Sequence, residues 1–440
     1  MVCAGVFAGP HSALAKPQAE KGASIAELRA EYERLSRAYA ATVPGWRPER
    51  LASGSLLFVA PDQYVGAEAQ DEGFRAARNK YADALFGLAK QAAEAGQLSL
   101  AFEWATEAVR ENPDHADARR VLGYELADGQ WLTPFAKRMV DAGKVWDSKR
   151  GWVPADETGA EPKPTKDGWQ VRTDHFLVTS NHSLAAAAEL AARLERLHQI
   201  WRQLFAGFYF SEREVRGLFA GERPARERHQ PFHVFYHRDK DDYIAALVGR
   251  QPRIAETLGI YFDADREAHF FAGDERNAAT LNHEAIHQLF QETRLAARHV
   301  GDTANFWIVE GIATYSETLR EHRDPTAGLY YTIGESSAGR LPAARERLLV
   351  EKFYVPLDEL TRLGKDDLQR HSELAKLYSQ SAGLAALLMD GEEGRYREPL
   401  VVYLSTVYAG RDKAQSLSDA TGCSMVELDA AYRRYLESLP

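Results

Sequence analysis

Apolar residues recur every three or four positions from about residue 24 to residue 140, the spacing that predicts helices. Ser24 can cap the first of these helices, because its hydroxyl can accept a hydrogen bond from a backbone N–H in the first turn. The pattern therefore predicts a helical N-terminal region over residues 24–150. Residues 1–23 precede it as a leader or a disordered terminus.

Within this region, residues 82–113 carry small residues where two helices of a hairpin would pack closely. They are Ala89, Gly96, Ala101 and Ala108, and Pro113 closes the segment. This arrangement resembles a tetratricopeptide repeat, and Leu122-Gly123 stands where a second unit would begin. The resemblance implies a protein partner for the helical region. A generic helical hairpin is the alternative interpretation.

The pattern changes after residues 151–168, which combine Gly, Pro and charged residues without periodicity and are predicted to form a linker. Strands are expected at residues 169–173, 175–179, 232–237 and 267–271, and helices at 183–205, at 242–247 and over most of the chain from 277 onward. Residues 211–229 mix charges of both signs and are predicted to be a solvated loop. Strands followed by a helical half predict an α+β domain with a cleft over residues 169–440.

Composition narrows the range of functions. A chain of 440 residues with 45% hydrophobic and 27% charged residues has the composition of an ordinary globular protein of two or three domains. A net charge of −10 argues against nucleic acid as the main partner. The two cysteines, Cys3 and Cys423, exclude a disulfide framework and any Cys-x-x-Cys site.

The first fifteen residues are small and apolar and end in Ala13-Leu-Ala15, which has the form of an export cleavage site. They lack a basic segment, so a truncated signal peptide and a simple disordered terminus both remain open. The first alternative implies a periplasmic or secreted protein and the second a cytoplasmic one. Beyond these residues no apolar run approaches the roughly 18 residues that span a bilayer, so no transmembrane helix is expected.

Residues 281–288 contain the motif H-E-x-x-H within a stretch whose apolar periodicity predicts a helix. A spacing of four places His283 and His287 on one helix face, about 6 Å apart along the axis. Two imidazoles so placed can bind one zinc ion. Glu284 can then reach a water on the metal without joining the coordination shell. The motif alone is only suggestive, because short strings also occur by chance.

A second segment can supply the missing ligand. Residues 305–317 predict another helix, and Glu310 stands 22 intervening residues beyond His287. A catalytic zinc needs a third protein ligand and one open position, which a carboxylate from a second helix can provide. Gly311 and Ala313 would let this helix pack closely on the first.

The motif H-E-x-x-H followed by W-x-x-E-G-x-A-x-Y (His283 to Tyr315) resembles the gluzincin metallopeptidases, the clan that includes thermolysin and aminopeptidase N. More closely, residues 75–435 resemble the peptidase MA-like proteins that carry a helical repeat region ahead of the zincin domain. The resemblance implies a two-lobed, thermolysin-like domain, with a sheet lobe, antiparallel or mixed, and a helical C-terminal lobe. It also implies zinc as the cofactor and His283, His287 and Glu310 as its ligands.

In the aminopeptidase N branch, a tyrosine at a comparable distance after the third ligand stabilises the oxyanion, and Tyr378 is the candidate that this similarity implies. A neutral O–H donor aimed at developing negative charge strengthens in the transition state. The alternatives are that Tyr378 is a core aromatic residue or that His371 supplies the donor. The G-x-M-E-N stretch of that branch is absent, which favours an endopeptidase. His269, on the strand before the zinc helix, is expected to line the cleft.

The remaining histidines and Glu317 are not predicted to be metal ligands. His229, His233 and His237 recur every four residues, but the alternation around them predicts a strand, on which four residues span about 13 Å and cannot share one ion. His175 and His182 are isolated in the sequence. Glu317 lies seven residues after Glu310, where it can either orient a ligand imidazole or remain a surface charge.

The sequence therefore predicts a zinc metallopeptidase acting on a peptide or protein substrate, with Glu284 as general base and Tyr378 as oxyanion donor. One alternative is an inactive zincin that binds a partner through its helical repeats. Another is a scaffold whose zinc is structural, although structural zinc sites are usually closed by four protein ligands, mostly cysteines.

Overall fold

The computed structural model describes residues 23–43, 53–65, 71–156, 163–223, 230–273, 277–294 and 296–440. The leader (apart from residue 23), the middle of the predicted linker and His229 lie outside these ranges. The fold is mixed α+β, with 55% of the residues helical and 14% in strands. The predicted fold class is confirmed at this level.

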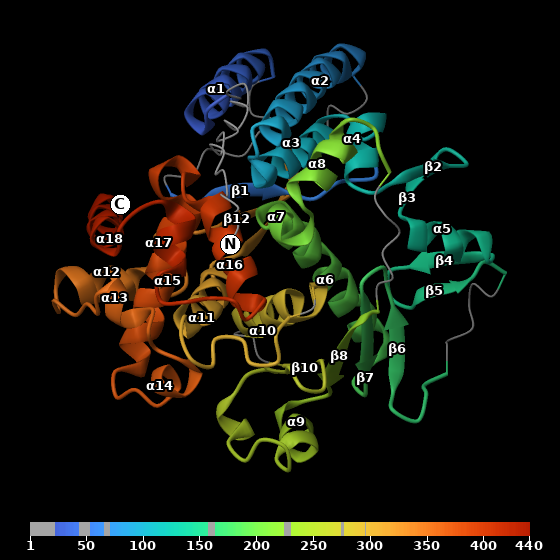
Figure 1. Ribbon diagram of the computed structural model, residues 1–440. Coiled ribbons are helices and arrows are strands. Elements are labelled where there is room, and N and C mark those ends of the chain that lie inside the picture. The colour runs from blue at the N-terminus through green and yellow to red at the C-terminus, as the bar shows by residue number, and fades with distance from the viewer. Residues whose placement is uncertain are drawn as a thin grey trace, which may run out of the picture.

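The N-terminal region combines helices with short strands (Figure 1). Its elements are α1 (Ile25–Thr42), β1 (Ser55–Phe58), α2 (Glu72–Glu94), α3 (Leu98–Glu111), α4 (Ala116–Val121), β2 (Glu125–Ala127), β3 (Gln130–Leu132), α5 (Pro134–Asp141), β4 (Lys144–Asp147) and β5 (Gly151–Pro154). The helices α2 and α3 form the predicted hairpin, with Ala89, Ala101 and Ala108 fully buried and Gly96 at the turn with a φ of +74°.

The prediction of a helical region is wrong at β1 and again after α3. Where a second repeat was expected, α4 is only six residues long and is followed by the antiparallel hairpin β2–β3. Asp128 and Gly129 both have positive φ, as a two-residue hairpin turn requires, so this turn signal outweighs helical spacing. The predicted linker is also wrong at its start, because residues 151–154 form β5 and pair with β4.

The second part of the chain contains a five-stranded sheet with the order β6-β7-β8-β10-β9. Its elements are β6 (Trp169–Arg172), β7 (Phe176–Ser180), α6 (Leu184–Leu204), α7 (Ala206–Tyr209), α8 (Glu212–Phe219), β8 (Phe232–His237), α9 (Lys240–Leu247), a 3-10 turn (Ile254–Glu256), β9 (Ile260–Phe262) and β10 (Glu267–Phe271). The three central strands are parallel, and β6 and β9 form antiparallel edges. The long helix α6 connects β7 to its parallel neighbour β8.

The predicted solvated loop at residues 211–229 is wrong over its first part. Residues 212–219 form α8, which begins with a capping box between Ser211 and Glu214. Val215, Leu218 and Phe219 are buried in one cluster with the N-terminal helices. Apolar residues at helical spacing thus outweigh the charges that surround them.

From residue 277 the chain is mostly helical, as predicted, with one hairpin that the sequence pattern did not reveal. Its elements are α10 (Asn277–Thr293), α11 (Phe306–Ser316), β11 (Arg320–Asp324), β12 (Gly328–Ile333), α12 (Leu341–Leu349), α13 (Leu357–Leu360), α14 (Lys365–Gln369), α15 (Leu374–Asp390), a 3-10 turn (Gly391–Gly394), α16 (Arg397–Tyr408), α17 (Ser416–Thr421) and α18 (Met425–Ser438). Among the described helices, none combines the length and the apolar character that crossing a bilayer needs.

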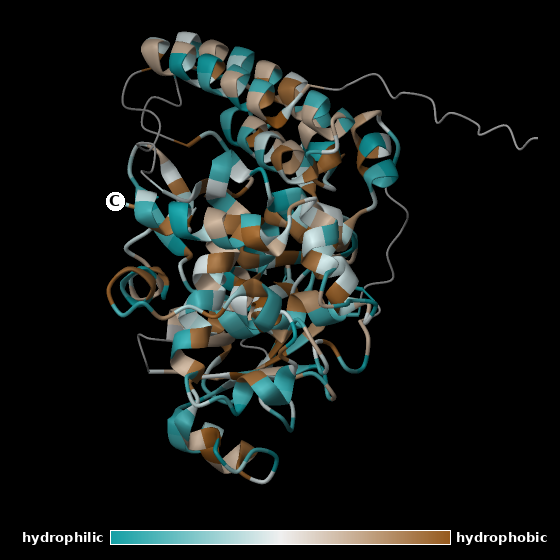
Figure 2. Cartoon of the chain, turned by 60° about the vertical axis from the view of Figure 1, so that its left-hand side comes forward, coloured by the Kyte–Doolittle hydropathy of each residue, from teal (hydrophilic) through white to brown (hydrophobic). Residues whose placement is uncertain are grey.

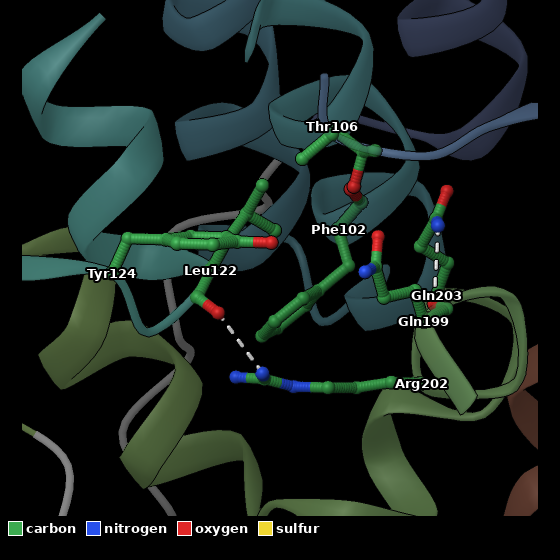
Figure 3. A pocket seen from close by; sticks show the side chains of 8 residues that line it. Phe102, Thr106, Leu122, Tyr124, Gln199, Arg202 and Gln203 are labelled. Carbon is green, nitrogen blue, oxygen red and sulfur yellow. Dashed lines mark hydrogen bonds between the residues drawn. The ribbon is translucent and has the colours of Figure 1, made fainter. Parts of the chain in front are cut away.

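The two regions share a sheet and polar contacts. Strand β1 pairs with β12, so a three-stranded sheet β1-β12-β11 joins the N-terminal region to the C-terminal half. On α6, Gln203 donates to the Phe58 carbonyl of β1 (3.0 Å) and Arg202 donates to the Leu122 carbonyl (3.0 Å). Figure 3 shows Arg202 beneath the ring of Phe102, beside a cavity of about 30 Å³.

Burial follows the hydropathy pattern. Figure 2 shows apolar and polar residues alternating around the helices, as expected for helices that bury one face. The larger apolar cluster contains residues from β1, the five-stranded sheet, α6, α10, α11 and α15. The helices that carry the candidate site are therefore held by the main core.

Candidate metal centre

His283 and His287 lie one turn apart on α10, and their rings converge. The two Nε2 atoms are 3.2 Å apart, and the ring planes meet at 76° with centroids 4.8 Å apart. Neutral imidazole binds metal through a lone pair in the plane of the ring. Rings that meet at a steep angle can direct two such lone pairs to one point.

Glu310 on α11 completes a set of three donor atoms. Its Oε2 is 3.4 Å from the Nε2 of His283 and 3.8 Å from that of His287. Ligands at about 2.1 Å from a tetrahedral zinc are themselves about 3.4 Å apart, so the three separations match that geometry. Two nitrogens and one carboxylate oxygen are a donor set typical of catalytic zinc, and the residues fit such an ion.

Burial and hydrogen bonds shift the pKa values of the two histidines in opposite directions. Burial opposes the charged form of His283, but hydrogen bonds to Glu310 and Glu317 outweigh it and raise the pKa of His283 to about 10. Burial lowers the pKa of His287 to about 4. A ligand imidazole must be neutral to bind metal, so metal binding here would release a proton from His283.

Glu317 orients the first histidine. Its Oε1 is 2.9 Å from the Nδ1 of His283, the ring nitrogen that points away from Glu310. A carboxylate on the outer nitrogen fixes the tautomer and the rotation of a ligand imidazole. Of the two interpretations of Glu317, the structure favours the orienting one.

Glu284 lies beside the set and outside it. Its Oε2 accepts a hydrogen bond of 2.9 Å from the backbone N–H of Tyr261 in β9. Burial raises the pKa of Glu284 to about 7, with the charge of Glu310 adding to the effect and that of His283 opposing it. A carboxyl group with this pKa can exchange a proton near neutral pH.

The position of α11 depends on two residues. Asn305, which precedes the helix with a φ of +57°, donates its side-chain amide to Asp412 (2.8 Å) and accepts from the hydroxyl of Tyr403 (2.6 Å). Gly311 was expected to bring α11 close to the first motif helix. Instead a Cβ at Gly311 would lie 2.9 Å from the Ser381 carbonyl of α15, so the glycine allows close packing on α15. Neither Asn305 nor the α15 contact was predicted.

A cleft of about 660 Å³ opens onto the candidate site. It is lined by His283, Glu284, His287, Glu310, Glu317 and Tyr378, together with β9, the loop before α11 and Lys365 of α14. Tyr378 interacts with Glu310 and helps to lower the pKa of that carboxyl, while burial raises the pKa of Tyr378 itself, so its hydroxyl stays protonated. The predicted site residues on α10, α11 and α15 therefore line one cleft.

The expectation that His269 lines the cleft is wrong. The strand that contains His269, β10, is paired on both sides, and the edge strand beside the site is β9. His269 is 4% exposed, hydrogen-bonds to His237 (3.1 Å) and does not line the cleft. His371 is also outside the lining residues and accepts from the backbone of Glu373. Sequence reasoning missed β9 because its three residues are too few for a periodic pattern.

His233 and His237 lie on strand β8, as predicted, but His175 is not isolated. It is 2.7 Å from Glu195, and its ring stacks on that of His198 with centroids 3.7 Å apart and planes at 23°. Nearly parallel rings direct their lone pairs side by side instead of to one point. Glu195 also accepts from the backbone N–H of His175 (2.7 Å), so this cluster fits a structural role in the turn before β7.

No protein-family model matches the chain, and no curated protein matches it either.

Proposed function

We propose that the chain is a zinc-dependent peptidase of the gluzincin type, with two lobes on either side of the cleft. The observation that carries this proposal is the convergence of His283, His287 and Glu310 from two helices, with Glu284 beside them and outside the donor set. Zinc held by these ligands would polarise a substrate carbonyl and make a bound water acidic.

In this proposal Glu284 is the general base. It takes a proton from the attacking water and delivers it to the nitrogen of the leaving amine. The hydrogen bond from Tyr261 N–H occupies one carboxylate oxygen, so the other is available for proton transfer. A carboxyl group in this position can be charged before attack and neutral afterwards.

Tyr378 is the oxyanion donor of this proposal. Its hydroxyl reaches Glu310 at the edge of the donor set, and its raised pKa keeps the proton available for donation. A neutral donor that meets the developing charge contributes to lowering the barrier. The substrate of this proposal is a peptide bond within a longer chain, because the sequence lacks the G-x-M-E-N stretch and the cleft is also lined by β9 and the loop before α11.

The test is digestion of a diverse peptide library by the wild type and by Glu284→Gln. The glutamine is nearly isosteric, so fold and zinc content should survive while turnover falls on the order of 10²–10⁴-fold. Glu359→Gln, which changes an exposed carboxylate on α13, is the matched control and should retain turnover.

Equal cleavage by wild type and Glu284→Gln would show that Glu284 is not the base. If neither protein cleaves any peptide while both bind zinc, the peptidase proposal is wrong. The alternative of a binding module that acts through the α2–α3 hairpin would then gain support.

A further inference from the structure

Arg340 lies between two groups of the candidate site. It immediately precedes α12 and lines the cleft, with 39% of its side chain exposed. Its Nε is 3.4 Å from Oε2 of Glu317, and its guanidinium carbon lies 5.4 Å from the centre of the Tyr378 ring. The side chain therefore makes an ion pair on one side and a cation–π contact on the other.

Each of the two residues that Arg340 contacts also interacts with a residue of the donor set. Glu317 uses its other oxygen, Oε1, to hold the Nδ1 of His283 at 2.9 Å. Tyr378 lines the same cleft as Glu310 and helps to lower the pKa of that carboxyl. Arg340 is thus one contact removed from two of the three donors, along two separate routes.

The backbone that carries Arg340 is held in place. Gly339 has a φ of +56°, and a Cβ there would lie 2.8 Å from Cγ2 of Thr318, just beyond the end of α11. The N–H of Gly334 donates to the hydroxyl of the same Thr318 at 2.8 Å. The loop from residue 334 to residue 340 is therefore packed on the end of the helix that carries Glu310.

We propose that Arg340 is a positioning residue that fixes Glu317 against His283 and holds the Tyr378 ring beside Glu310. The inference rests on the proposed function, because the groups that it positions are the zinc ligands and the oxyanion donor. A guanidinium suits this task, since its planar fork can pair with a carboxylate while its face covers an aromatic ring. Lysine offers only a point charge and would do this incompletely.

The experiment compares Arg340→Gln, Arg340→Lys, Glu317→Gln and the double variant Glu317→Gln/Arg340→Gln with the wild type. Arg362→Gln is the matched control, since Arg362 pairs with Asp358 on the surface and does not line the cleft. Two readouts need no turnover: zinc affinity by competition with a chelator, and the visible absorption spectrum of the cobalt(II)-substituted protein, which reports ligand geometry.

Outer contacts to ligand histidines typically contribute 10–100-fold to metal affinity. We expect Arg340→Gln to weaken zinc binding about tenfold and to alter the cobalt spectrum, and Arg340→Lys to restore part of both. The double variant should lose less zinc affinity than the sum of the two single losses, because part of the effect of Arg340 passes through Glu317. Arg362→Gln should match the wild type.

Wild-type zinc affinity and an unchanged cobalt spectrum in Arg340→Gln would overturn the positioning role while leaving the proposed function intact. Additive losses in the double variant would also overturn it, because they would show that Arg340 does not act through Glu317. Failure of the wild type itself to bind zinc would overturn the proposed function and this inference together.

Discussion

At the scale of single residues, the base of the candidate site is supported by a second half-buried carboxyl group on α10. Glu292 accepts hydrogen bonds from the hydroxyl of Tyr261 (3.2 Å) and from the side chain of Gln288 (2.9 Å). The backbone N–H of the same Tyr261 holds Glu284. Glu292 thus anchors the residue that positions the base.

Glu292 should make the stability of the protein depend on pH. Burial raises its pKa to about 7 in the folded protein, against about 4.3 in an unfolded chain. The folded state therefore binds this proton more tightly than the unfolded state. The contribution of Glu292 to the free energy of unfolding is fully present below about pH 4.3 and is lost as the pH rises through about 7. Glu292→Gln, which cannot ionise, should be more stable than the wild type at pH 8 by on the order of 2 kcal/mol, and about equal at low pH.

Urea unfolding of both proteins at pH 5 and pH 8 measures this difference. The exposed Glu359→Gln should follow the wild type at both values. If Glu292→Gln loses as much stability between the two pH values as the wild type, the pKa of Glu292 is not raised in the folded protein.

Site residues were predictable where the signal is local. His283 and His287 are four residues apart on one helix, and Glu310 and Glu317 are seven residues apart, so the spacing alone places each pair on one helix face. Tyr261 and Asn305 were not predictable. Each acts through its backbone or through partners far along the chain, such as Asp412 for Asn305.

At the scale of elements, strand β1 ties the N-terminal region to the half that carries the candidate site. It pairs with β12 from Ser55↔Ile333 to Phe58↔Tyr330, across more than half of the sequence. Leu57 is 1% exposed and belongs to the same apolar cluster as α10 and α11. A four-residue strand whose partner is so distant leaves no local pattern, which is why the sequence did not reveal it.

Leu57→Ala should therefore destabilise the protein by about 2–5 kcal/mol, the range for a leucine removed from a packed core. Leu126→Ala is the matched control, because Leu126 on β2 is 60% exposed and its loss should change stability by less than about 0.5 kcal/mol. Chemical denaturation compares the two. Equal effects would mean that β1 does not bury Leu57 against the C-terminal half.

At the scale of the whole molecule, the α+β class followed from the change of periodicity near residue 169, but the clean division at a linker did not hold. Buried hydrogen bonds connect residues on either side of the predicted linker. Ser99 Oγ donates to the Leu204 carbonyl (2.9 Å), and the Arg110 side chain donates to the Ala327 carbonyl (2.8 Å). Such long-range contacts depend on tertiary packing, which hydrophobic periodicity does not encode. The protein partner of the helical region stays a prediction.

The proposed function depends on a single zinc ion bound by His283, His287 and Glu310. Elemental analysis of protein purified without chelator measures it directly, with His287→Ala and Glu284→Gln as the paired variants. We expect about one zinc per chain in the wild type and in Glu284→Gln, and a large loss of zinc in His287→Ala. Stoichiometric zinc that persists in His287→Ala, or a wild type without zinc, would contradict it.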